Sequence, residues 1–367
     1  MKHLKLFSIT AICMVTLLFT VQAIGSDDIT FSGQVIDENN AAVSGVTVYL
    51  YKSSGFNLDT EEKSNYLITR TICGEDGQFF FEHIAPSSRN TFIITAVKPG
   101  LSFGGCTYSY DRDPDNPRIM LTTPETVSGK IIDKDNKLIQ NARVAGVAQL
   151  NQPENAYVYP DKQANILTAT ADSNGEFTLM NLPKNSQLRL TIEADGYARR
   201  RVAGSGKDYF LIKSGASGLV YTLVPEGKIT GAIIDQESGN KITSLPLYCW
   251  SGGTVFRAKY DRQGNFIFEG LNADKYAIGM AGLFEHSVEY TLPVKKDVAV
   301  SEGECVNVSM ELAKPGWVTG KVTDVQTGKP LKNVVVVFTN RLPLEETYPS
   351  NYLLSAEDGT YKITLPP

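Results

Sequence analysis

Hydrophobic and polar residues alternate in short runs along most of the chain, and the three-to-four-residue spacing typical of helices is nearly absent. Alternation of this kind places every second side chain on one face of an extended strand. Glycine, aspartate and asparagine, which favour turns, come directly before many of these runs. The pattern therefore predicts an all-β fold of short antiparallel strands. Three clear examples are FFFEHI at 79–84, FTLMNL at 177–182 and FIFEGL at 266–271.

A glycine-x-aliphatic-x-aspartate motif occurs four times, at intervals of about 90 to 100 residues. Each copy ends a strand-like run and is followed by a polar turn and a second strand-like run. We predict that the two runs pair as a hairpin. The four copies are Gly33–Asp37, Gly129–Asp133, Gly231–Asp235 and Gly320–Asp324.

A second motif follows the first in every copy, and it consists of a turn ending in glycine and an aromatic residue two positions later. The glycine allows the positive φ that the turn needs. Two motifs in the same order, four times over, indicate four internal repeats. The copies of the second motif are Asp76–Phe79, Asn174–Phe177, Gln263–Phe266 and Asp358–Tyr361.

Repeats of this length match a small domain with one core, so we predict a tandem array of β-sandwiches. The fourth repeat has no counterpart of residues 184–225 of the second, and we expect it to be an incomplete sandwich in a chain that continues beyond residue 367. The predicted segments are a signal peptide at 1–23 and repeats at 29–123, 124–225, 226–314 and 315–367.

The N-terminus has the features of a secretory signal peptide. Lys2 and Lys5 precede a short apolar run at 6–20, and the residues 21–23 (VQA) resemble a cleavage site. No later apolar run is long enough to cross a bilayer as a helix. We therefore expect an exported protein, secreted, periplasmic or on the cell surface, with no membrane span in the mature chain.

The charge balance gives no reason to expect a nucleic-acid partner, because 35 basic and 40 acidic residues leave a net charge of −5. The basic run at 199–201 is interpreted as a solvated strand edge. Only His83 and His286 follow the predicted signal peptide, with no clustered metal-ligand spacing and no nucleophile elbow. We predict no enzymatic activity, no catalytic residue and no cofactor.

One acidic loop has some features of a calcium site. Asp111, Asp113 and Asp115 alternate as calcium ligands do, but Asn116 replaces the expected glycine and Thr122 replaces the expected glutamate. An acidic surface loop is the preferred interpretation, and the three aspartates are weak candidate metal ligands.

The cysteines after the predicted signal peptide fall into two repeats. Cys73 and Cys106 belong to the first repeat, and Cys249 and Cys305 belong to the third. Because an exported protein meets an oxidising compartment, we expect the disulfides Cys73–Cys106 and Cys249–Cys305. Four cysteines allow three connectivities, and four reduced thiols are the alternative.

The order of the two motifs, followed by a leucine-proline pair and a later glycine-tyrosine pair, resembles the carboxypeptidase regulatory-like domain. The second repeat fits most completely, through Asp172–Phe177, Leu182-Pro183 and Gly196-Tyr197, whereas the first and third lack the leucine-proline pair. The resemblance implies Greek-key, transthyretin-like β-sandwiches, grouped with starch-binding-like folds. It also implies non-catalytic accessory modules of exported proteins.

Several aromatic residues are candidates for carbohydrate binding, since exposed rings stack on sugar faces. Trp317 occupies an outward strand position, where contact with the third repeat is the alternative. Tyr157, Tyr159, Tyr348 and Tyr352 lie in long segments before the second motif, where half-buried strand ends are the alternative.

These observations favour an exported, non-catalytic modular protein that acts as a surface or periplasmic spacer, adhesion or presentation module. Its expected partners are another surface protein or a polysaccharide. The alternatives are a carbohydrate-binding protein that uses the loop aromatics and the N-terminal accessory region of a larger secreted enzyme.

Overall fold

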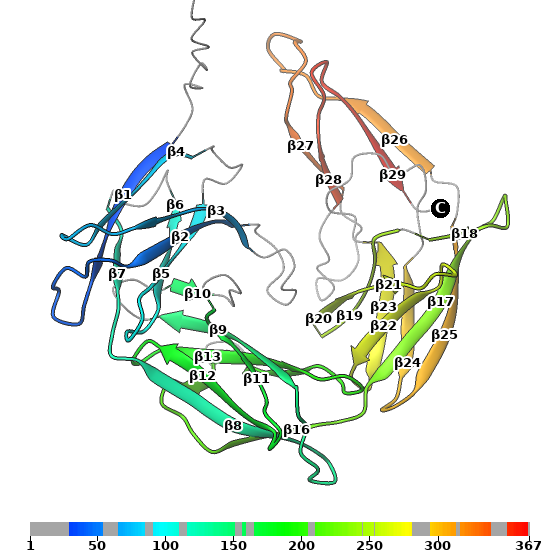
Figure 1. Cartoon of the computed structure of the whole chain (residues 1–367). Helices are drawn as coiled ribbons and strands as arrows, with labels where there is room; N and C mark the ends of the chain where they lie inside the picture. Colours follow the sequence, from blue (N-terminus) through cyan, green and yellow to red (C-terminus); the bar gives the residue numbers. More distant parts are fainter. Residues whose placement is uncertain are drawn as a thin grey trace, which may run out of the picture.

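The computed structural model of the chain is built from β-strands in every part that it describes (Figure 1). The described residues contain no helix, as the alternating pattern predicted. The predicted signal peptide lies outside the described residues. The structure describes residues 29–53, 65–84, 91–109, 116–150, 156–158, 165–204, 210–243, 245–252, 254–280, 294–312, 316–338 and 351–365.

The described residues include no helix that is both long enough and apolar enough to span a membrane.

The first unit is a sandwich of a three-stranded sheet, ordered β4-β1-β7, and a four-stranded sheet, ordered β3-β2-β5-β6. Alternate side chains of both sheets point into a shared core, so Phe79 and Phe81 are buried while Phe80 is exposed. The strands are β1 (Ile29–Ile36), β2 (Thr47–Ser53), β3 (Asn65–Ile72), β4 (Gln78–Ile84), β5 (Thr91–Val97), β6 (Gly104–Ser109) and β7 (Arg118–Met120).

The second unit repeats this plan with sheets β12-β8-β16 and β10-β9-β13-β14, the latter with β11 and β15 also attached. Its strands are β8 (Glu125–Asp133), β9 (Arg143–Leu150), β10 (Ala156–Val158), β11 (Thr168–Thr170), β12 (Glu176–Leu182), β13 (Gln187–Glu193), β14 (Arg200–Val202), β15 (Ile212–Lys213) and β16 (Leu219–Leu223).

The third unit pairs the sheet β18-β17-β22-β21, to which β25 is added, with the sheet β20-β19-β23-β24 around a core of its own. Its strands are β17 (Gly227–Asp235), β18 (Lys241–Ile242), β19 (Leu247–Ser251), β20 (Thr254–Arg257), β21 (Lys259–Tyr260), β22 (Phe266–Leu271), β23 (Asp274–Met280), β24 (Lys295–Val300) and β25 (Cys305–Leu312).

The described part of the fourth unit holds two two-stranded sheets, β26-β29 and β27-β28. Its first strand pairs with the strand of the second motif, just as in the other units. The strands are β26 (Gly316–Lys321), β27 (Val335–Phe338), β28 (Asn351–Leu354) and β29 (Thr360–Leu365).

The first strand of each of the first three units also pairs with the last strand of that unit, and this pair is parallel. β1 pairs with β7, β8 with β16, and β17 with β25. All other strand pairs among the described residues are antiparallel. The last strand therefore returns to the edge where the unit began and covers the first strand on its second side.

The predicted hairpin after the first motif is wrong, because the two strands belong to opposite sheets. Asp37 directly follows β1, and its carboxylate accepts the amides of Asn39 and Ala41, both at 2.8 Å. Only the single bridge between Ile36 and Ala42 follows before the chain crosses to β2. Both runs carry one apolar face, and facing each other from opposite layers buries both.

The two sequence motifs of a unit lie against each other. The amide of Val35, in the first motif, donates to the carbonyl of Gly77, in the second, at 2.9 Å. The same bond joins Ile131 to Gly175 at 2.8 Å in the second unit. In the fourth it joins Val322 to Gly359 at 2.9 Å. The two motifs of a unit are therefore joined by hydrogen bonding into one structural feature.

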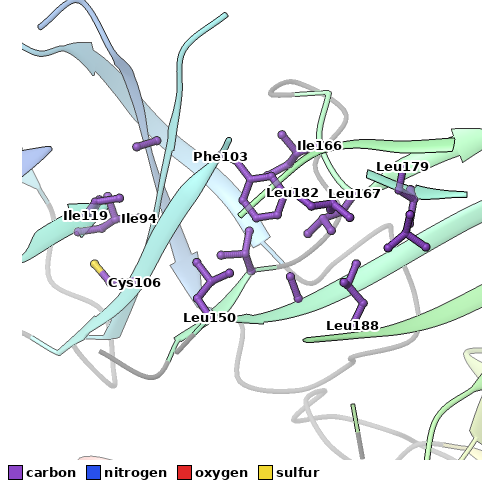
Figure 2. Close-up of a cluster of buried hydrophobic side chains, with 14 of the residues drawn as sticks. Ile94, Phe103, Cys106, Ile119, Leu150, Ile166, Leu167, Leu179, Leu182 and Leu188 are labelled. Carbon is purple, nitrogen blue, oxygen red and sulfur yellow. The ribbon is translucent and has the colours of Figure 1, made fainter. Parts of the chain in front are cut away.

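The cores of the first two units are continuous (Figure 2). Phe103, in the connection between β5 and β6, is 1% exposed and lies beside Leu182 and Ile166 of the second unit. Its amide donates to the carbonyl of Asn181 at 2.9 Å. This first junction is largely apolar, and the amide of Lys184 also donates across it to Oγ1 of Thr122 at 2.9 Å.

Candidate functional site

Backbone hydrogen bonds join the second unit to the third. The amide of Arg199, just before β14, donates to the carbonyl of Gly270 at 2.8 Å. The side-chain amide of Asn272 donates to the carbonyl of Arg199 at 2.9 Å. Glu226 accepts the amide of Gly270 within the third unit at 2.6 Å, and its own amide donates to the carbonyl of Gly196 of the second unit at 3.0 Å. The second junction is therefore held by polar groups.

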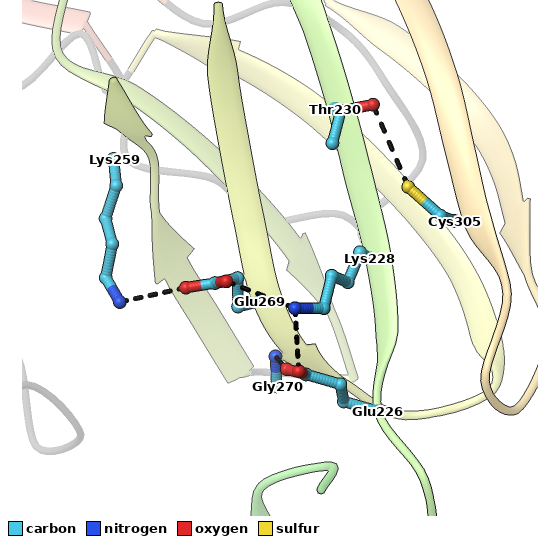
Figure 3. A network of polar contacts seen from close by, with 7 residues as sticks. All are labelled: Glu226, Lys228, Thr230, Lys259, Glu269, Gly270 and Cys305. Atoms are coloured by element: carbon cyan, nitrogen blue, oxygen red, sulfur yellow. Dashed lines mark hydrogen bonds and ion pairs between the residues drawn. The ribbon is translucent and has the colours of Figure 1, made fainter. Parts of the chain in front are cut away.

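A chain of alternating charges continues from this junction onto the third unit (Figure 3). Lys228 lies 2.9 Å from Glu226 and 3.2 Å from Glu269, and Glu269 lies 3.0 Å from Lys259. The hydrogen bond to Lys259 lowers the pKa of Glu269, and the bond to Glu226 raises the pKa of Lys228. Charge pairing thus favours the ionised forms of Glu269 and Lys228.

Four arginines of the second unit gather beside the same junction. They are Arg143, Arg199, Arg200 and Arg201. Glu193, at the end of β13, lies between two of them: its carboxylate is 3.4 Å from Nη1 of Arg143 and 2.5 Å from Nε of Arg199. Burial lowers the pKa of Arg143, while the neighbouring Glu193 acts in the opposite direction. Guanidinium groups remain charged in proteins.

Aromatic rings fix the orientation of two of these arginines. The guanidinium carbon of Arg199 lies 4.7 Å from the ring centre of Phe256, which belongs to the third unit. The guanidinium carbon of Arg200 lies 5.6 Å from the ring centre of Tyr221, and its Nη1 donates to the carbonyl of Thr222. Cation–π contacts of this kind hold guanidinium planes in place without neutralising their charge.

A hollow of about 230 Å³ lies between the two units. Nη1 of Arg199 is buried and has no hydrogen-bond partner among the described residues. A charged donor in this state is suited to a negatively charged acceptor. All the lining side chains are polar or charged: Thr191, Arg199, Arg200, Arg201, Thr254 and Asn272.

The interpretation of 199–201 as a solvated strand edge is therefore wrong for Arg199, whose side chain is only 21% exposed and faces the third unit. The sequence feature that could have indicated a site here is the run of three consecutive arginines in a chain without a basic excess. The hollow itself forms only where the third unit packs against the second.

Among the predicted aromatic candidates, Tyr157 is the one whose side chain the structure describes. It lies on β10, is 43% exposed, and stacks on Phe210 with ring centres 5.5 Å apart. The backbones of Trp317 and Tyr352 pair with Thr364 and Val337. The side chains of Trp317 and Tyr352, and the whole of Tyr159 and Tyr348, lie outside the described residues.

The weak candidate metal ligands Asp111, Asp113 and Asp115 also lie outside the described residues, as does His286. His83 lies on β4, but its side chain is not described. Within the described ranges, no group of three or more histidine, cysteine, aspartate or glutamate side chains is placed to hold a metal ion.

The structure contains neither of the two expected disulfides. Cys73 follows β3 and Cys106 lies in β6, and these strands form opposite edges of the sheet β3-β2-β5-β6. Three inter-strand steps separate them by about 14 Å, whereas a disulfide needs Cα atoms within about 7 Å.

The third-unit pair is separated by the layers of the sandwich. Cys249 is buried on the core face of β19, and Cys305 is exposed on β25, which belongs to the opposite sheet. Cys73 and Cys106 of the first unit are both buried.

Comparisons with solved structures find bacterial proteins, several of them pilins, at low identity. The Bacillus anthracis TIE protein is 12% identical over 78% of this chain and 51% of that one, with a TM-score of 0.21. This chain thus spans about half of that protein. A streptococcal ancillary pilin is 13% identical over 78% of this chain and 99% of its own, with a TM-score of 0.22. The minor pilin GBS52 of Streptococcus agalactiae is 13% identical over 52% and 96%, with a TM-score of 0.24.

No protein-family model matches the chain, and no curated protein matches it either. The resemblance to the carboxypeptidase regulatory-like domain therefore stays a prediction.

Proposed function

We propose that the protein is an exported, non-catalytic spacer whose consecutive β-sandwiches hold a partner or a further domain at a set distance. The observation that carries this proposal is the backbone hydrogen bonding between successive units. Phe103 donates to Asn181 at the first junction, and Arg199 donates to Gly270 at the second. Bonds between main chains fix the direction of one unit relative to the next, which a spacer requires.

The two junctions differ in chemistry, and this supports a spacer with one stiff and one adjustable joint. The first buries apolar side chains in a core shared by two units. The second depends on hydrogen bonds between polar groups and on an ion pair, such as Asn272 with Arg199 and Lys134 with Glu302. Salt screens exposed charge pairs and leaves apolar contacts intact.

Spin-label distance measurements test the proposal. Labels on Asn39→Cys and Lys137→Cys span the first junction, and labels on Lys137→Cys and Gln263→Cys span the second, all in a Cys305→Ser background. We expect narrow distance distributions at both junctions and a broader one at the second in about 1 M salt. A matched control carries a glycine-serine linker inserted at the junction. Distributions as broad as those of the control would contradict a spacer.

We propose domain limits of 29–123, 124–225, 226–314 and 315–367 for this array. Limited proteolysis of the purified protein tests them, because cleavage concentrates in exposed connections between compact units. Fractionation of cells that express the whole chain tests export. Retention of the full-length protein inside the cytoplasm, with residues 1–23 still attached, would contradict it.

Carbohydrate binding is a second candidate function, favoured by the exposed ring of Tyr157 on β10. Stacking on Phe210 holds that ring in one orientation, which reduces the entropy lost when a sugar binds. Affinity electrophoresis on a panel of polysaccharides would show retardation that Tyr157→Ala abolishes. Phe80→Ala is the matched control, since Phe80 is 59% exposed on another unit. Equal retardation of both variants would contradict the role of Tyr157.

A further inference from the structure

We propose that the hollow at the second junction binds the oxyanion group, a carboxylate or a sulfate, of an acidic sugar. The site is separate from Tyr157 and does not depend on the spacer role. Its anchor is Arg199, which Glu193 holds on one side at 2.5 Å and the ring of Phe256 holds on another. Nη1 of the same guanidinium is buried without a hydrogen-bond partner among the described residues.

The chemistry of the lining selects the class of ligand. Arg199, Arg200 and Arg201 line the hollow, and the planar fork of a guanidinium matches the two oxygens of a carboxylate or sulfate. The remaining lining residues carry hydroxyl and amide groups, which suit a ligand that presents hydroxyls: Thr191, Thr254 and Asn272. A volume of about 230 Å³ admits a small group such as one sugar residue. None of the described lining residues has an apolar side chain, which disfavours fatty or aromatic acids.

The ligand would contact both units at once. The arginines and Thr191 come from the second unit, and Thr254 and Asn272 come from the third. A ligand that binds only when the two units are docked stabilises the docked arrangement by mass action. Binding should therefore narrow the spin-label distance distribution across the second junction.

Calorimetric titration of the purified full chain tests the site with three probes: glucuronate, glucose 6-sulfate and neutral glucose. We expect both acidic sugars to bind and glucose not to bind. Acetate and inorganic sulfate should compete with the acidic sugars, because they carry the same oxyanion. Binding should weaken as salt rises, as it does for charge-assisted contacts.

Three variants locate the binding. Arg199→Gln should weaken glucuronate binding at least tenfold. Thr254→Trp, which fills the hollow from the third unit and leaves every arginine in place, should abolish it. Arg118→Gln is the matched control, since Arg118 belongs to the first unit, bonds Asn40 and is not among the residues that line the hollow, and this variant should bind glucuronate as the unmodified protein does. Unfolding curves identify any variant that fails to fold.

Three outcomes would overturn the proposal. The first is the absence of binding by both acidic sugars at millimolar concentration. The second is binding that Arg199→Gln and Thr254→Trp leave unchanged. The third is tighter binding of an acidic dipeptide than of either sugar, which would identify a peptide ligand instead.

Discussion

Gly33 and Phe79 face one another across strands β1 and β4, and the phenyl ring occupies the space that a side chain at Gly33 would need. A Cβ atom there would stand 2.1 Å from Cζ of the ring. The first glycine of one motif and the aromatic residue of the other are thus a single packing unit. The same pairing joins Gly129 to Phe177, Gly231 to Phe266 and Gly320 to Tyr361.

Replacing Gly33 by alanine should destabilise the first unit by about 3 kcal/mol or more, because the ring and the carbonyl of Pro117 both stand in the way of the new methyl group. Gly100→Ala is the control: its position is open, and only its φ of 83° opposes a side chain, at a cost of about 1–2 kcal/mol. Urea unfolding measures both variants. Equal costs would show that the ring is not the obstacle.

The fourth unit allows a double-mutant cycle on the same pairing. The three atoms nearest to a Cβ at Gly320 all belong to the ring of Tyr361. Gly320→Ala should therefore cost stability when Tyr361 is present and much less when Tyr361→Leu accompanies it. We expect a coupling of about 1–2 kcal/mol in unfolding experiments. Additive effects of the two changes would contradict the pairing.

Phe103→Ala should destabilise the pair of first and second units by about 3–5 kcal/mol, since the ring is fully buried in their shared core. It should also separate one unfolding transition into two, which differential scanning calorimetry resolves. Phe80→Ala removes an equally large but exposed ring and should change stability by less than about 0.5 kcal/mol. A single cooperative transition in Phe103→Ala would contradict a shared core.

The third unit should lose stability in acid partly through Glu269. Hydrogen bonds from Lys259 and Lys228 keep the pKa of this carboxylate below its ordinary value of 4.5. The unfolded state therefore binds a proton more readily, so the contribution is present above pH 4.5 and is lost as pH falls below it. Glu269→Gln and Lys259→Gln should both flatten the pH dependence of stability below that point. Parallel curves for variant and unmodified protein would refute this assignment.

The cysteines should differ sharply in reactivity. Burial raises the pKa of Cys73 to about 11 and that of Cys249 further, so few thiolates form at these sites near neutral pH. Cys305 is exposed and should be alkylated first in the native protein. Mass spectrometry after iodoacetamide treatment identifies each modified cysteine. Resistance of Cys305 before reduction, followed by labelling after it, would instead reveal a disulfide.

Local patterns were sufficient for the strands and turns of this protein. Alternation identified strands such as β4, where Phe79 and Phe81 are buried and Phe80 is exposed. The turn glycines were equally readable, and Gly77 adopts the expected positive φ of 71°. Strands and turns depend on residues that lie within a few positions of one another, so they can be predicted directly from the sequence.

Contacts between residues far apart in the sequence could not be predicted from these local patterns. The strand after Asp37 was expected beside β1 but lies in the opposite sheet, and the expected cysteine pairs lie on opposite edges or layers. Alternation shows that one face of a strand is apolar, but it does not identify the strand or sheet that packs against that face. The same alternation is compatible with several strand pairings, and the packing of the two sheets selects one of them.

The sequence by itself determined the strand content, the four repeats and the two motifs that mark them, because each follows from local backbone preference and from recurrence. The tertiary structure alone decided that Gly33 and Phe79 are one packing unit, that Phe103 belongs to the core of its neighbour, and that Arg199 faces a hollow. These are contacts between residues far apart in the chain. Their existence depends on how whole sheets and units pack, which no single stretch of residues encodes.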